Sequence, residues 1–139
     1  MRRTKDHLNS IGLLLLRTGA GALLFFGHGL PKLLHWNERA SRFANPIGLG
    51  SEVSFSLVVF AEVVCAAAVA LGLATRLAAA PIIFFLLVGA FVQNGSAPFG
   101  DKELALVYLI PFAALTLTGG GRYALDTIIL RGRAGRRRL

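Results

Sequence analysis

Five polar side chains within or beside long apolar segments are the candidates for chemistry in this sequence: His28, Lys32, Glu62, Gln93 and Lys102. A lysine ammonium can hydrogen-bond a carbonyl oxygen and stabilise the negative charge that forms on its reduction. A glutamate can accept or pass a proton, and a histidine can relay one near neutral pH. These side chain types suit proton-coupled chemistry on an apolar, carbonyl-bearing ligand such as a quinone.

Glu62 is the most informative of the five. It is the only acidic residue in "SLVVFAEVVCAAAVALGLATR", residues 56–76. A charge in the middle of a membrane helix costs roughly 2.5–3.5 kcal/mol, so it usually faces other helices and finds a partner there. Ala66 and Ala70 share its helix face and allow a second helix to approach closely. We therefore expect the ionised Glu62 to face Lys32 or Lys102.

The elements that must position these residues are apolar helices. The chain has 139 residues, of which 55% are hydrophobic, and a mean hydropathy of +0.64. Its apolar residues form blocks that are apolar on all sides, as in helices that face lipid. Helices are required because unpaired backbone cannot face hydrocarbon. The sequence predicts an all-α integral membrane four-helix bundle, a single domain over residues 1–139 with spans at about 11–34, 54–74, 77–92 and 104–118.

The distribution of basic residues predicts the orientation of the bundle. The side that carries both termini and the tail 119–139 has ten lysines and arginines in its loops and ends, and the opposite side has three. Positively charged loops stay in the cytoplasm, so we expect both termini to be cytoplasmic and the protein to lie in the plasma (inner) membrane. We expect the basic tail to contact anionic membrane lipids rather than nucleic acid.

Depth within the bilayer brings the five candidates together. Lys32 lies near the outer end of the first span, and Glu62 lies about 12 Å below the outer end of the second. Pro31 should bend the first span beside Lys32. We expect the candidates to converge on the outer half of the bundle. Arg17 lies near the cytoplasmic side, where we expect it to extend to lipid phosphate.

Other chemistries lack their motifs. The sequence contains no H-E-x-x-H, C-x-x-C, P-loop or dinucleotide fingerprint. Cys65 is the single cysteine, which excludes an internal disulfide and a cysteine-built metal site. Haem would need two axial ligands, and His28 is the only histidine within a span. We therefore expect no haem, metal or nucleotide.

Three stretches together resemble the DoxX family of small four-span membrane proteins. They are "LLRTGAGALLFFGHGLPKLLHW", "AEVVCAAAVALGLATRLAA" and "DKELALVYLIPFAALTLTGGGRYALD", and they cover nearly the whole chain. The first supplies Arg17 and Lys32, the second Glu62 and Arg76, and the third Lys102. The proline in "GHGLPK" departs from the tighter glycine-to-lysine spacing common in the family.

The resemblance implies a four-helix bundle with redox work at the membrane. The sequence offers no electron carrier of its own, so we expect a partner oxidoreductase subunit to supply electrons. Two other hypotheses remain open. The protein could be a scaffold subunit, with homo-oligomers among its possible assemblies, in which a Lys32–Glu62 pair only fixes helix packing. It could also be a transporter of lipid or solute that uses the same cavity. His28 could be an ordinary core histidine, and Gln93 and Lys102 could be hydrated helix ends.

Overall fold

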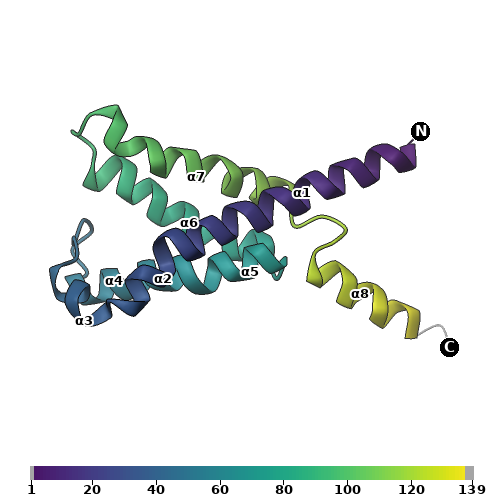
Figure 1. The fold of residues 1–139 in the computed structure, drawn as a ribbon, viewed down its shortest axis with the longest axis horizontal. Coiled ribbons are helices and arrows are strands. Elements are labelled where there is room, and N and C mark those ends of the chain that lie inside the picture. The colour runs from purple at the N-terminus through teal and green to yellow at the C-terminus, as the bar shows by residue number, and fades with distance from the viewer. Residues whose placement is uncertain (1, 137–139) are drawn as a thin grey trace.

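The computed structural model describes the backbone of residues 2–136 and the side chains of residues 4–131. Its main feature is four helical rods packed side by side (Figure 1). The first rod comprises α1 (Arg2–Leu24), a π-helical segment (Phe25–Gly29) and α2 (Leu30–Leu34). The second comprises α4 (Ser51–Phe60), a π-helical segment (Ala61–Cys65) and α5 (Ala66–Leu71). The third comprises α6 (Thr75–Leu87) and a π-helical segment (Val88–Gln93), and the fourth is α7 (Phe99–Thr118).

Shorter elements lie at the two ends of the bundle. At one end, called here the α3 end, α3 (Trp36–Arg39) and a 3-10 turn (Ala40–Arg42) join the first two rods. At the other, the α8 end, the start of α1 and the surface helix α8 (Leu125–Arg136) both extend beyond the bundle (Figure 1). No strand occurs in residues 2–136, so the predicted all-α class is confirmed.

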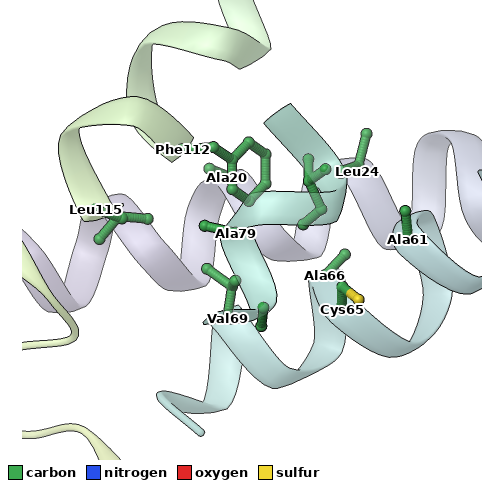
Figure 2. Close-up of a cluster of buried hydrophobic side chains, with 11 residues drawn as sticks. Ala20, Leu24, Ala61, Cys65, Ala66, Val69, Ala79, Phe112 and Leu115 are labelled. Carbon is green, nitrogen blue, oxygen red and sulfur yellow. The ribbon is translucent and has the colours of Figure 1, made fainter. Parts of the chain in front are cut away.

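The rods form a closed arrangement, since α1 contacts α5 and α7, and α6 contacts the same two helices. Phe112 and Leu115 of α7 are fully buried against Ala79 of α6 and neighbouring side chains (Figure 2). Small residues allow the closest approach. A Cβ added to Gly21 would lie 2.7 Å from the Ala66 carbonyl oxygen. This contact confirms the predicted small-residue face on the second rod.

Within the part of the chain that the structure describes, three segments are long and apolar enough to cross a membrane: Thr4–Leu34, Ser51–Leu71 and Thr75–Gln93. The fourth rod, α7, has 20 residues. Its first turns carry Asp101, Lys102 and Glu103, so its uncharged stretch is too short. Composition alone therefore does not identify α7 as a membrane span. Large apolar side chains such as Leu15 and Leu77 point away from the bundle. Such an apolar exterior suits contact with lipid.

The second rod ends at Leu71, three residues earlier than the sequence predicted, because Gly72 adopts a left-handed conformation with φ of 79°. A Cβ is disfavoured there, so glycine ends the helix cheaply. Ala74 also has a positive φ of 43°, and α6 begins directly after it. The hairpin between the two rods is therefore tight, as predicted.

Arg17 does not extend to lipid phosphate, and that expectation was wrong. Only 2% of the residue is exposed. Its guanidinium donates to the carbonyl oxygen of Ala70, in the last turn of α5, and to that of Tyr123 at 2.9 Å, just before α8. Arginine satisfies carbonyls that the end of a helix leaves without a partner. Arg17 therefore ties α5 and the approach to α8 to the first rod.

The stretch "RYALDTIILRGR", residues 122–133, is predicted from sequence to form a short surface helix in which Arg122 reaches Asp126 at i+4. The helix exists as α8 but begins only at Leu125, so Arg122 precedes it, and no Arg122–Asp126 ion pair occurs among the described side chains. The Asp126 carboxylate instead accepts from the backbone N–H of Ala74, and its own N–H donates to the Gly72 carbonyl at 3.2 Å. The side chains of the basic tail beyond Arg131 lie outside the described residues.

Candidate functional site

The centre of the candidate site is an ion pair between the first two rods. The Lys32 ammonium lies 2.7 Å and 2.6 Å from the two carboxylate oxygens of Glu62. The side chains are only 19% and 16% exposed, respectively. Charge-assisted hydrogen bonds of this length are strong when water is largely excluded. The sequence allowed Lys32 or Lys102 as the partner of Glu62, and the structure selects Lys32.

Backbone geometry brings the two charges together. A Cβ added to Gly29 would lie 2.5 Å from the backbone carbonyl oxygen of Glu62, so only glycine permits this approach of the two rods. Lys32 lies three residues after Gly29 and therefore points to the same neighbour. The backbones of the two rods touch at Gly29 and Glu62, and the ion pair forms one turn further along.

Irregular helix surrounds the site on three rods. Lys32 follows one π-helical segment, Glu62 lies within the second, and Gln93 ends the third. In the first rod the N–H of Leu30 donates to the carbonyl of Phe25, five residues earlier. Pro31 has no N–H to continue the α-helical pattern, which explains the disturbance there. Such segments occur frequently at functional sites.

A cavity of about 210 Å³ adjoins the ion pair. Most of its lining is apolar, including Leu24, Ile82 and Phe85. Its polar side chains are those of Lys32, Glu62, Gln93 and Ser54. Partly exposed apolar side chains also line it, among them Ile47, Leu49 and Leu57. An apolar cavity with a few convergent polar groups is typical of small-molecule sites.

Ser54 is a member of this site that sequence reasoning missed. It is 4% exposed, and its hydroxyl has no hydrogen-bond partner among the described residues. A buried hydroxyl without a partner is unfavourable, so its presence in a cavity favours a polar ligand group there. The available signal was its spacing of eight residues from Glu62, which keeps both on one broad helix face.

His28 and Lys102 do not join the cavity. The half-buried His28 ring packs edge-on against Tyr108 of α7, with ring centroids 5.5 Å apart. The Lys102 ammonium donates to the carbonyl oxygen of Gly95 at 2.7 Å, within the connection between the third and fourth rods. The structure thus brings together Lys32, Glu62 and Gln93 from the predicted set.

A second, more polar hollow adjoins the first at the α3 end. It is lined by Glu38, Arg39 and Arg42 together with Lys32 and Gln93, which also line the apolar cavity. Lys32 and Gln93 therefore lie between a polar hollow and an apolar one. In the part of the chain that the structure describes, no three His, Cys, Asp or Glu side chains are grouped to hold a metal ion.

Comparison with known proteins places this site in a family. The sequence profile of the DoxX family matches residues 12–95, more than half of the chain. The chain belongs to the DoxX family. The DoxX match covers the first rod from residue 12 onward and all of the second and third rods, with Lys32, Glu62 and Gln93, whereas α7 lies beyond it.

The protein is also similar to a Bacillus subtilis (strain 168) protein named "Putative oxidoreductase CatD". The two chains are 36% identical over 126 residues, which cover 88% of this chain and 90% of the relative. No solved structure matches the chain. This DoxX protein is thus a membrane protein with a relative named for redox chemistry.

Proposed function

We propose that this DoxX protein binds a quinone-like ligand in the cavity beside Lys32 and Glu62 and acts with a partner oxidoreductase. The observation that carries the proposal is a mostly apolar cavity whose polar groups are an ion pair, an amide and a hydroxyl that has no partner within the described part of the chain. The name of the relative supports a redox role.

The cavity volume bears on how such a ligand would bind. Pockets that enclose a drug-sized ligand usually measure about 300–1,000 Å³, and this cavity measures about 210 Å³. It suits a ring-sized head group, with an apolar tail outside along Leu49 and Leu57 at its edge. A ligand with this division is amphipathic, as membrane quinones are.

Each polar residue has a role in the proposed reaction. Reduction of a quinone takes two electrons and two protons, and the partner oxidoreductase supplies the electrons. Lys32 would donate a hydrogen bond to a carbonyl oxygen and stabilise its developing negative charge. Glu62 would pass one proton to that oxygen, and the second carbonyl oxygen would take the other proton from water. The polar hollow that shares Lys32 and Gln93 with the cavity offers a route for protons from water.

The proposal places four spans in the plasma membrane with both termini in the cytoplasm. The fourth span is α7, which packs against α1 and α6 along the bundle although its first turns are charged. The excess of basic residues at the α8 end supports the orientation. Fusing a reporter that is active only in the cytoplasm to the C-terminus tests it, and an inactive reporter would overturn the orientation.

A scaffold role is the second candidate, and one observation favours it. Lys32 and Glu62 satisfy each other without any ligand. In that case the pair only fixes the packing of the first two rods, and the cavity holds bulk lipid.

Mass spectrometry of an organic extract separates the two candidates. Protein purified in detergent should retain quinone at about one molecule per chain in the wild type. Glu62→Gln should lose it, and Glu103→Gln, which changes an exposed carboxylate at the start of α7, should retain it. Bulk lipid alone in all three preparations would exclude the quinone site and leave the scaffold role.

A further inference from the structure

A separate cleft occurs at the α8 end of the bundle, far from the Lys32–Glu62 pair along the first rod. A cleft of about 620 Å³ lies between the start of α6, the glycine segment 119–121 and the start of α8. Its lining is more polar than that of the cavity beside Lys32 and Glu62, and it includes Thr75, Arg76, Arg122 and Asp126.

The start of α6 provides backbone donors in this cleft. The helix begins at Thr75, and its first intrahelical donor is Ala78, whose N–H donates to the Ala74 carbonyl at 2.9 Å. The N–H groups of Thr75, Arg76 and Leu77 have no acceptor among the described residues. Exposed N–H groups and the positive end of the helix dipole together attract anions.

An independent observation points to a ligand at the same place. Thr75 is 4% exposed and lines the cleft, yet its hydroxyl forms no hydrogen bond in the described part of the chain. A Cβ added to Gly120 would lie 2.6 Å from this hydroxyl oxygen. Glycine at position 120 therefore leaves the hydroxyl uncovered. The hydroxyl is therefore open to the cleft although the rest of Thr75 is buried, and it can hydrogen-bond a ligand there without giving up a contact within the described part of the chain.

The charges in the cleft favour an anion. Arg76 donates to the Leu117 carbonyl at 3.1 Å, which holds its guanidinium beside the glycine segment. Arg122 is exposed and forms no ion pair among the described side chains. Asp126 is the opposing charge, but its carboxylate already accepts from the Ala74 N–H. Two arginines face one carboxylate that is already hydrogen-bonded, so the cleft carries net positive charge.

We propose that this cleft binds a phosphate group, carried either by an anionic phospholipid or by a free phosphate ion. Arginine forks, backbone N–H groups and a hydroxyl reach the cleft from several directions, which matches the several oxygens of phosphate. This cleft shares no lining residue with the cavity beside Lys32 and Glu62, so failure of one proposal leaves the other standing.

The test measures binding to the full-length protein after removal of co-purified lipid. Native mass spectrometry follows titration with phosphatidylglycerol, with diacylglycerol as the lipid without phosphate, and calorimetry follows titration with inorganic phosphate. The variants are Arg122→Gln, whose side chain forms no hydrogen bond or ion pair with the described residues, and Thr75→Val, which removes a hydroxyl without changing charge. The matched control is Arg39→Gln at the α3 end, where the side chain is also exposed.

Loss of one charge-assisted contact should weaken binding about tenfold or more in Arg122→Gln, and Arg39→Gln should bind as the wild type does. If Arg122→Gln binds phosphatidylglycerol more weakly, the phosphate group belongs to a lipid. If it binds only inorganic phosphate more weakly, the ligand is the free ion. Weaker binding in Thr75→Val would show that the hydroxyl contacts the phosphate. If Arg122→Gln binds both phosphate sources as tightly as Arg39→Gln does, the proposal is wrong.

Discussion

Removing one partner of the Lys32–Glu62 pair should destabilise the bundle far more than removing both. In Lys32→Met the carboxylate, now in a site only 16% exposed, has no counter-charge. Protonating an ordinary glutamate carboxylate at pH 7 costs about 3.7 kcal/mol, and neutralising an ordinary lysine costs about 4.6 kcal/mol. A stranded group can always escape by changing its protonation state, so these values are upper limits. They agree with the 3–5 kcal/mol typical of a broken buried pair.

The double variant Lys32→Met/Glu62→Leu should be close to the wild type in stability, because replacing a whole buried pair with apolar side chains is often neutral. The coupling energy of the cycle should therefore be about 3 kcal/mol or more. Unfolding in mixed micelles with increasing sodium dodecyl sulfate measures it. The fluorescence of Trp36, the only tryptophan, reports the transition, since its ring packs on Phe55 at 5.1 Å.

If the losses of unfolding free energy in the two single variants add to give the loss in the double variant, the pair does not stabilise the bundle in the way that its geometry indicates.

Three further predictions follow from contacts elsewhere in the structure. Gly29→Ala should destabilise the protein by about 1–3 kcal/mol or more through overlap with the carbonyl on the second rod; Gly27→Ala, which meets no atom within 4 Å, should be neutral or stabilising in the same unfolding assay. Arg17→Lys should speed hydrogen exchange in α8 because one of two carbonyl contacts is lost, and unchanged exchange would show that Tyr123 is held by other contacts. Ser54→Ala should leave stability unchanged or raise it, since the hydroxyl has no hydrogen-bond partner among the described residues, but it should weaken quinone retention. Undiminished retention would remove Ser54 from the site.

The sequence predicted the helices well because their signal is strong. Blocks that are apolar on every side have few alternatives to helix in a membrane, and the depth of Lys32 and Glu62 along their spans predicted a meeting that the structure confirms. The ends of the helices were predicted less accurately, because they depend on the conformation of the turns that follow. Gly72 ends the second rod, and its positive φ could not be read from the hydrophobic pattern.

The members of the site were predicted only in part, since depth along a helix does not determine the direction of a side chain. His28 has the right depth but packs on Tyr108. Lys102 donates to a carbonyl in the connection that leads into its own helix. The sequence could not reveal the true partners of Arg17, which are the carbonyls of Ala70 and Tyr123, because these become its neighbours only after the chain has folded. The prediction that Arg17 reaches lipid was wrong for this reason. Ser54 has no charge to draw attention to it, and only its missing partner reveals it.

The π-helical segments have a consequence for the winding of the rods. One extra residue in a turn shifts the phase of everything beyond it by roughly the 100° that an α-helix turns per residue. Lys32 lies beyond such a shift, so a regular α-helix over Phe25–Gly29 would direct its ammonium away from Glu62. Deleting a single residue from this segment would let it wind as a regular α-helix and still direct Lys32 to Glu62, because the extra residue is what requires the wider turn. At its present length, the rod can form the charge pair only while this segment keeps its irregular winding.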